Sequence, residues 1–176
     1  MPRDFKNKAI EITLQAGKLL KSNLGKVTKI GYKGEVNLVT EVDHKSEDLT
    51  VDFLTKHFPN HSILTEERKK IEKSSPYKWI VDPLDGTTNF AHSFPVFCVS
   101  LALEYEGEIV LGVIYNPCLG ELFVAEENKG AFLNKKRIFV SKTKNLSRSL
   151  LATGFPYDVR TSKNNNLNHF SNFAVR

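Results

Sequence analysis

The residues with the clearest chemical potential lie in one short segment. Asp82 follows the apolar run 79–81, and Asp85 comes three residues later, after Pro83. Because proline fixes the backbone, one tight turn can direct both carboxylates at the same point. Two carboxylates held together repel, so one takes up a proton unless a cation lies between them. A hard divalent cation such as Mg²⁺ resolves that conflict, and the carbonyl of Leu84 is a plausible further oxygen ligand.

Gly86, Thr87 and Thr88 come directly after this pair. Glycine allows the backbone to approach a ligand closely. A helix that begins here would present free N–H groups and the positive end of its dipole, both of which suit a phosphate. Carboxylates for a metal beside a phosphate cradle indicate metal-assisted phosphoryl transfer. An acidic turn that only caps a helix remains the alternative.

Three more acids stand where other predicted elements begin or end. Glu66 and Glu67 follow the predicted strand 62–65, so adjacent strands would bring them to the edge that carries the paired aspartates. Asp43 begins the predicted helix at about 43–58, where its carboxylate would accept a hydrogen bond from a threonine hydroxyl and make that hydroxyl a proton acceptor. A solvated strand end for the glutamates, and a plain N-cap for the aspartate, remain the alternatives.

The elements that would position these side chains follow from hydrophobic periodicity. Apolar residues at helical spacing predict a helix over 4–24, and Thr40 with Asp43 matches the entry pattern of the second helix. A charged loop is expected at 68–76. Short runs rich in Val, Ile, Leu, Phe and Tyr predict an antiparallel meander, with strands at about 96–105, 108–116, 120–126 and 136–140. Two helices followed by such a meander indicate an α+β fold, with two long helices packed on a largely antiparallel sheet.

Composition sets the broad class. The 176 residues are 40% hydrophobic and 26% charged, which is typical of a globular protein. The formal charge of +5 permits contact with nucleic acid or transcription machinery but does not require it. Two cysteines form no disulfide framework, and no apolar run approaches the length of a membrane span, so a cytoplasmic protein without a membrane partner is expected. His57 and His61 are expected to be exposed loop residues, because Pro59 and Asn60 separate them.

The nine-residue segment Asp82-Pro-Leu-Asp-Gly-Thr-Thr-Asn-Phe resembles the signature of the inositol monophosphatase family of Mg²⁺-dependent, lithium-sensitive phosphomonoesterases. Other segments resemble further family motifs and occur in the family's order: residues 37–43, 63–67, 94–100, 112–117, 130–134 and 154–158. One departure is Thr65, which stands where the family usually has glycine. The resemblance implies that the chain is part of a layered αβαβα sandwich and acts as a homodimer.

The resemblance also implies a role for each matching residue. It assigns the metal to Glu66, Asp82, Asp85 and the carbonyl of Leu84. It assigns the substrate to Glu66, Leu84, Asp85, Gly86 and Thr87, with the amides of the last two around the phosphate. Thr87, polarised by Asp43, would orient and deprotonate the attacking water, and Glu67 would assist as a further catalytic residue. The cofactor is Mg²⁺, and the substrate is a small phosphate monoester.

A motif that the family carries near its C-terminus, Trp-Asp-x-Ala-Ala/Gly, is absent. The chain is therefore expected to be the N-terminal portion of a longer enzyme. Residues 1–150 would form the α+β domain that binds metal and phosphate, and residues 151–176 would begin a C-terminal α/β domain. Alone, such a portion is expected to bind Mg²⁺ incompletely and to turn over poorly.

Within the enzymes, myo-inositol monophosphate is the favoured substrate because Thr88, Asn89 and Phe90 resemble the inositol type. Relatives that hydrolyse fructose 1,6-bisphosphate, histidinol phosphate or a 3′-phosphoadenosine nucleotide are the alternatives. A protein of a different class, which binds transcription or ribosome components without catalysis, is the remaining rival.

Overall fold

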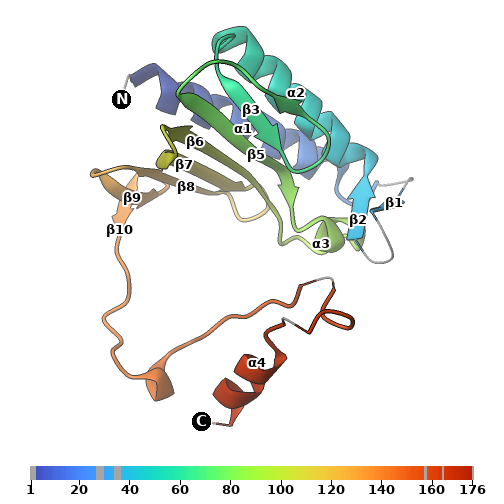
Figure 1. Ribbon diagram of the computed structural model, residues 1–176, viewed down its shortest axis with the longest axis vertical. Helices are drawn as coiled ribbons and strands as arrows, with labels where there is room; N and C mark the ends of the chain where they lie inside the picture. The colour runs from blue at the N-terminus through green and yellow to red at the C-terminus, as the bar shows by residue number, and fades with distance from the viewer. Residues whose placement is uncertain (1–2, 27–29, 34–36, 157, 164, 176) are drawn as a thin grey trace.

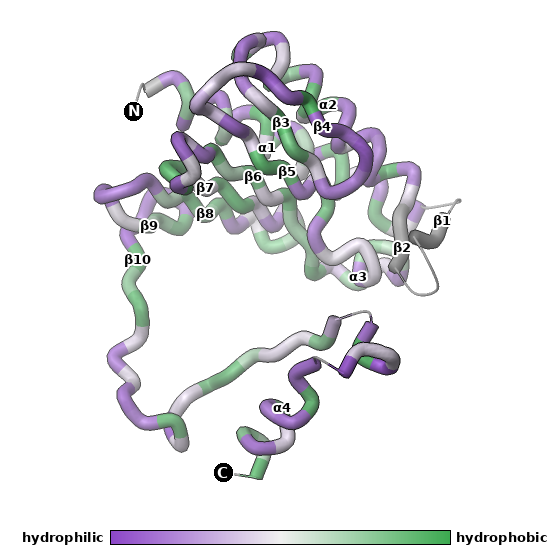
Figure 2. Tube along the Cα trace, in the orientation of Figure 1, coloured by the Kyte–Doolittle hydropathy of each residue, from purple (hydrophilic) through white to green (hydrophobic). Residues whose placement is uncertain are grey.

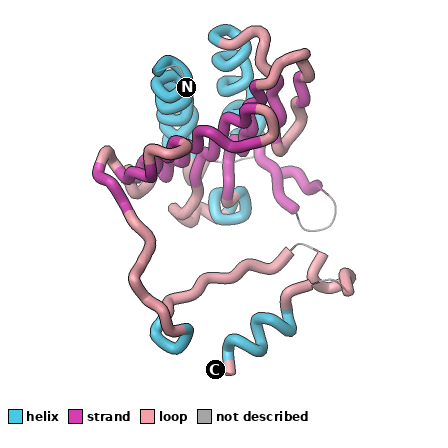
Figure 3. Tube along the Cα trace, turned by 60° about the vertical axis from the view of Figure 1, so that its left-hand side comes forward, coloured by secondary structure: helices cyan, strands magenta, loops and turns pink. Residues whose placement is uncertain are grey.

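The computed structural model describes residues 3–26, 30–33, 37–156, 158–163 and 165–175. Two long helices lie side by side on one face of an eight-stranded sheet (Figures 1 and 3). This arrangement confirms the predicted α+β class. Tyr157, in the last of the family-like segments, lies outside the described residues.

The helices are α1 (Arg3–Asn23), α2 (Glu41–His57), α3 (Thr87–Ala91) and α4 (Leu167–Ala174), with a 3₁₀ turn at Leu146–Arg148. The strands are β1 (Ile30–Lys33), β2 (Asn37–Thr40), β3 (Ser62–Thr65), β4 (Lys70–Ile71), β5 (Tyr77–Asp85), β6 (Cys98–Tyr105), β7 (Glu108–Asn116), β8 (Glu121–Glu126), β9 (Gly130–Leu133) and β10 (Lys136–Ile138). Strands β1 and β2 form a separate pair, and the large sheet has the order β10-β9-β8-β7-β6-β5-β3-β4. All its pairings are antiparallel except that of β3 with β5.

Helix α1 forms because its apolar residues recur every three or four positions. Ala9, Ile12, Ala16 and Leu20 lie on one face and are almost fully buried. That face packs on β6 and β7, whose buried residues alternate with less buried ones. The strands at the centre of the sheet are accordingly the most apolar part of the trace in Figure 2.

Helix α2 begins at Glu41, two residues earlier than predicted. Thr40 is the N-cap, and its hydroxyl accepts hydrogen bonds from the amides of Val42 and Asp43. Asp43 occupies the third helical position and accepts from the amide of Thr40 at 2.9 Å, which completes the predicted capping box. The alternative in which Asp43 itself is the N-cap is therefore wrong.

The sheet differs from the prediction in three places. Strand β5 continues through Pro83 to Asp85 rather than ending at Asp82, with an irregular register over its last residues. The predicted charged loop at 68–76 contains β4, which pairs with β3. Strand β9 was not predicted, because Gly130 made its short apolar run resemble the end of a turn.

After β10 the chain leaves the sheet, and the described residues that follow trace a separate path (Figure 1). Apolar side chains on this path are exposed, including Phe139 (80%), Val140 (94%) and Leu150 (102%). The boundary near residue 150 between two domains stays a prediction. Among the described helices, none is long and apolar enough to cross a membrane.

His61 is not the exposed loop residue that the sequence predicts. Its ring stacks on Phe58 and on Tyr77, with centroids 5.2 and 4.8 Å apart. Its Nδ1 is buried and has no hydrogen-bond partner in the described part of the chain. Burial lowers the pKa of His61, because the charged imidazolium loses its hydration there.

Acid should therefore weaken the fold through His61. As the pH falls below about 6.5, the unfolded chain takes up a proton that the folded imidazole binds less readily, so stability drops toward the lower folded pKa. Urea unfolding of the wild type should lose more free energy than that of His61→Phe between about pH 7.5 and pH 5.5, by at most about 1.4 kcal/mol per pH unit. His169→Phe, at an exposed position, is the control variant. If the stability of His61→Phe changed with pH as that of the wild type does, the role given to His61 would be refuted.

The contact between α1 and β7 should not tolerate a side chain at Gly17. A β-carbon there would lie 2.4 Å from Cδ1 of Tyr115. We expect Gly17→Val to lower the free energy of unfolding by about 1–3 kcal/mol, because the ring must move out of a packed position. Gly112→Val on β7 is the matched control, since a β-carbon there meets no atom within 4 Å. Equal effects of the two changes in urea titrations would contradict this account.

Candidate metal and phosphate site

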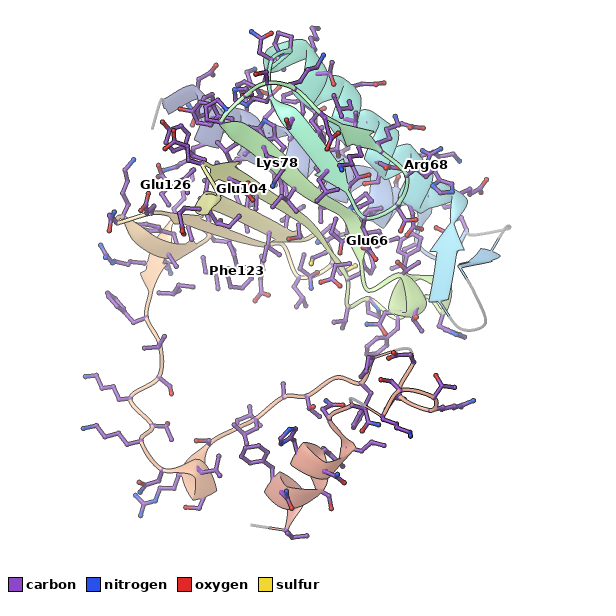
Figure 4. The ribbon with its side chains drawn as sticks, in the orientation of Figure 1. Glu66, Arg68, Lys78, Glu104, Phe123 and Glu126 are labelled. Atoms are coloured by element: carbon purple, nitrogen blue, oxygen red, sulfur yellow. The ribbon has the colours of Figure 1, made fainter. Side chains whose placement is uncertain are left out.

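The parallel pairing of β3 with β5 brings two acidic residues together. Thr65 lies opposite Val81 in the register, and the amide of Glu66 donates to the carbonyl of Val81 at 3.1 Å. Glu66, which directly follows β3, and Asp82, within β5, therefore meet at one end of the sheet (Figure 4 labels Glu66). The expectation that adjacent strands bring these acids to the same edge is confirmed.

The electrostatics of Asp82 reflect this crowding. Burial raises the pKa of Asp82, and the carboxylates of Glu66 and Asp85 raise it further, to about 8. The amide of Leu84 donates to Oδ1 of Asp82 at 3.1 Å and opposes the shift only in part. The close carboxyl groups therefore favour sharing a proton, and a cation bound among them would balance their charge instead.

The end of β5 is held in its irregular path from two sides. The hydroxyl of Ser46, on α2, donates to the carbonyl of Pro83 at 2.8 Å. Leu84 is 1% exposed and packs in the smaller of the two apolar clusters, with Phe90 and Phe97. Because Pro83 and Leu84 are anchored in this way, the positions of Asp82 and Asp85 on either side are fixed relative to each other.

A cysteine lies beside Asp85. The half-buried Cys98 donates from its thiol to Oδ2 of Asp85, with 3.5 Å between sulfur and oxygen. Burial raises the pKa of Cys98 to about 12, and the charge of Asp85 contributes to that rise. The side chain therefore remains a thiol at neutral pH and acts as a weak hydrogen-bond donor.

Gly86 occupies a position that only glycine suits. Its φ of +90° lies in the left-handed region, and a β-carbon would lie 3.1 Å from the carbonyl oxygen of Val96 and 3.3 Å from Cα of Phe97. Helix α3 begins at the next residue, Thr87, so the helix start that the sequence left open is present. The absence of a side chain at Gly86 thus allows residues 96 and 97 to pack directly against the backbone of this turn.

Asp43 and Thr87 meet although 44 positions separate them. Asp43 is fully buried, and its Oδ1 lies 3.1 Å from the hydroxyl of Thr87. The same hydroxyl lies 3.0 Å from the carbonyl oxygen of Leu84, so its single proton has two possible acceptors. In either arrangement the lone pairs of Thr87 remain available to a further donor, such as a water molecule.

The donor atoms at this end of the sheet suit a hard cation, because they are carboxylate and carbonyl oxygens. In the described ranges, however, no three acidic, histidine or cysteine side chains are grouped so that they could hold a metal ion. Glu66 and Asp85 each interact with Asp82 but do not form such a group with it. Glu67 is half-buried next to them.

Two further residues contact this region and were not predicted from the sequence. Glu47 is fully buried on α2, and Arg68, which follows the two glutamates, donates to it from its backbone and its side chain. The sequence spacing of Glu47 could have indicated its position, because Asp43 and Glu47 are four residues apart and a helix places both on the same face.

Comparison with known proteins agrees with this picture. A family model described as the inositol monophosphatase family matches residues 1–174. An inositol-1-monophosphatase of Synechocystis sp. is 46% identical over 160 residues, which are 89% of this chain and 56% of that protein. One of Mesorhizobium japonicum is 40% identical over 96% of this chain and 62% of its own length.

Solved structures are also similar. The inositol monophosphatase from Anabaena (Nostoc) sp. superimposes with a TM-score of 0.86 at 41% identity, over 98% of this chain and 64% of that one. The extragenic suppressor protein suhB from Bartonella henselae gives a TM-score of 0.78 at 43% identity, over 80% and 55% of the two chains. The shared structure is that of inositol monophosphatases, which confirms the predicted fold.

The chain belongs to the inositol monophosphatase family. More narrowly, several of its curated relatives are named inositol-1-monophosphatase. The chain spans about 56–62% of the length of these two relatives.

Removing the charge of Asp43 should destabilise the fold. Its carboxylate accepts from the amide and hydroxyl of Thr40 and faces the hydroxyl of Thr87. An asparagine would replace these charge-assisted hydrogen bonds by weaker neutral ones, and its NH₂ group would force the hydroxyl of Thr87 to donate to the carbonyl of Leu84 instead. We expect Asp43→Asn to cost about 1–3 kcal/mol in urea unfolding. Asp52→Asn, on the exposed side of the same helix, should change stability by less than about 0.5 kcal/mol. A loss of similar size in both variants would contradict the inferred role of these hydrogen bonds.

Proposed function

We propose that this chain supplies the metal- and phosphate-binding part of a Mg²⁺-dependent phosphomonoesterase that acts on myo-inositol monophosphate. The observation that carries the proposal is the meeting of Asp82 with Glu66 and Asp85, beside Thr87 and its partner Asp43. Neighbouring carboxylates that raise the pKa of Asp82 provide the negative charge that a divalent cation would neutralise.

The residues that would hold Mg²⁺ are Glu66, Asp82, Asp85 and the carbonyl of Leu84. The cation would supply Lewis-acid stabilisation of phosphate oxygens and a more acidic bound water. Thr87 would orient that water, because its hydroxyl donates to Asp43 and so accepts from the water. The amides of Gly86 and Thr87 would bind the phosphate, and Glu67 would act as a further catalytic residue.

One proton links the proposed metal site to the proposed water site. The hydroxyl of Thr87 can donate to Asp43 or to the carbonyl of Leu84, but not fully to both. A cation held by the carbonyl of Leu84 would make that oxygen a poorer acceptor, and the hydroxyl of Thr87 would then favour donation to Asp43. In that arrangement Thr87 would accept a hydrogen bond from the attacking water.

The substrate class is supported by the names of the relatives. Curated proteins 40–46% identical to this chain are named inositol-1-monophosphatase. One solved structure, 26% identical, is described as an inositol monophosphatase-fructose 1,6 bisphosphatase, so a bisphosphate is the natural competitor in a substrate panel. These relatives of the chain are named as phosphatases, so they do not support a role in nucleic-acid binding without catalysis.

The remaining proposals follow the resemblance. They are inhibition by lithium, a homodimeric state, a cytoplasmic location, and a C-terminal α/β domain that begins near residue 151. The free thiols of Cys98 and Cys118 agree with a reducing compartment. The exposed apolar residues after β10 agree with a segment that packs against further structure.

Calorimetric titration with Mn²⁺, a usable substitute for Mg²⁺, tests the metal site directly. We expect the wild type to bind Mn²⁺ and inorganic phosphate to strengthen that binding. Asp82→Asn should weaken Mn²⁺ binding by at least about tenfold, because a charged ligand becomes a neutral one. Saturating Mn²⁺, at about 100 times its Kd, should add about 2.7 kcal/mol to the free energy of unfolding of the wild type.

Asp52→Asn, on the exposed side of α2, is the matched control and should bind Mn²⁺ as the wild type does. Equal Mn²⁺ affinity in Asp82→Asn, or no binding by the wild type at millimolar Mn²⁺, would overturn the proposed site. In a phosphate-release panel with Mg²⁺, run on the longer enzyme of which this chain is proposed to be a part, faster hydrolysis of fructose 1,6-bisphosphate than of myo-inositol 1-phosphate would overturn the proposed substrate.

A further inference from the structure

Glu47 is a fully buried carboxylate to which the proposed mechanism gives no role. Its Oε1 accepts the amides of Arg68 and Lys69, each at 2.9 Å, and a short hydrogen bond from the hydroxyl of Thr65. Its Oε2 accepts Nε of Arg68 at 2.9 Å. Burial raises the pKa of Glu47, but these hydrogen bonds outweigh burial, so the pKa lies below its usual value and the group is charged.

The residues that donate to Glu47 lie on both sides of Glu66 and Glu67 in the sequence. The amide of Thr65 donates to the carbonyl of Lys69 at 2.9 Å, and the amide of Lys69 donates to the hydroxyl of Thr65 at 2.8 Å. Residues 65–69 thus form a turn closed by these two hydrogen bonds, and Glu66 and Glu67 are two of its residues. Because the amide of Glu66 also bonds to Val81, the turn is fixed both to α2 and to β5.

Arg68 extends this network to the surface of α2 (Figure 4). Its Nη2 lies 2.9 Å from Oδ1 of Asp48, and its side chain is 43% exposed. A buried carboxylate that lacks donors costs far more than a neutral residue of the same size, so the turn and Glu47 depend on each other. Any shift of the turn away from α2 would leave Glu47 charged and unpaired.

We propose that Glu47 is a positioning residue for the cation site, which acts through Thr65 and Arg68 to hold Glu66 beside Asp82. This inference rests on the proposed function, because it presumes that Glu66 binds the metal. The hydroxyl of Thr65 supplies two of the bonds that close the turn, one to Glu47 and one from the amide of Lys69.

Conservative pairs of variants test the proposal. We expect Thr65→Val and Glu47→Gln to weaken Mn²⁺ binding by about 10–100-fold, as is typical when a group that orients a metal ligand is removed. Thr65→Ser keeps the hydroxyl and should bind within about twofold of the wild type. The exposed Thr55 on α2 gives the matched control, and Thr55→Val should bind as the wild type does.

Calorimetry measures the affinity of each variant, and urea unfolding of the same samples measures its stability. A purely structural role would lower the urea midpoint of Thr65→Val while the folded protein kept its Mn²⁺ affinity, and that result would overturn the inference alone. Failure of the wild type to bind Mn²⁺ would instead overturn the proposed function, and this inference with it. Should Glu47→Gln not fold, the comparison of Thr65→Val with Thr65→Ser decides.

Discussion

The site depends on one parallel strand pair in a sheet that is otherwise antiparallel. Parallel strands run in the same direction, so the residues after β3 and the last residues of β5 emerge at the same end of the sheet. This places Glu66 next to the half-buried Asp82, where the carboxyl group of Glu66 raises the pKa of Asp82. An antiparallel β3 would have put the two acids at opposite ends.

A single face of α2 then fixes the three segments that surround this pair. Asp43 faces Thr87 at the start of α3, Ser46 holds the carbonyl of Pro83 in β5, and Glu47 binds the turn after β3. The spacing of three and four residues is that of one helical face. Helix α2 therefore does more than cover the sheet, since its buried polar residues set the relative positions of elements far apart in the sequence.

Much of this could be predicted from local patterns. The helices, the capping box at Thr40 and the meander after residue 96 follow from periodicity and turn residues, and the alignment of Glu66 with Asp82 follows from two short strands ending in acids. The extension of β5 through Pro83 could not be predicted, because the hydrogen bond from Ser46 supports it from another element. His61 was misplaced for the same reason, since its stacking partner Tyr77 lies on a different strand.

The buried acids of this region also differ in how their charge is balanced. Glu47 is surrounded by backbone and side-chain donors, and its pKa falls below the usual value although burial acts in the opposite direction. Asp82 receives one backbone donor and faces two carboxylates, and its pKa rises to about 8. The fold thus supplies hydrogen-bond donors to Glu47, which holds the turn, whereas Asp82 lacks enough donors to balance the carboxylates around it. A cation site is expected where that deficit lies, which is at Asp82 and not at Glu47.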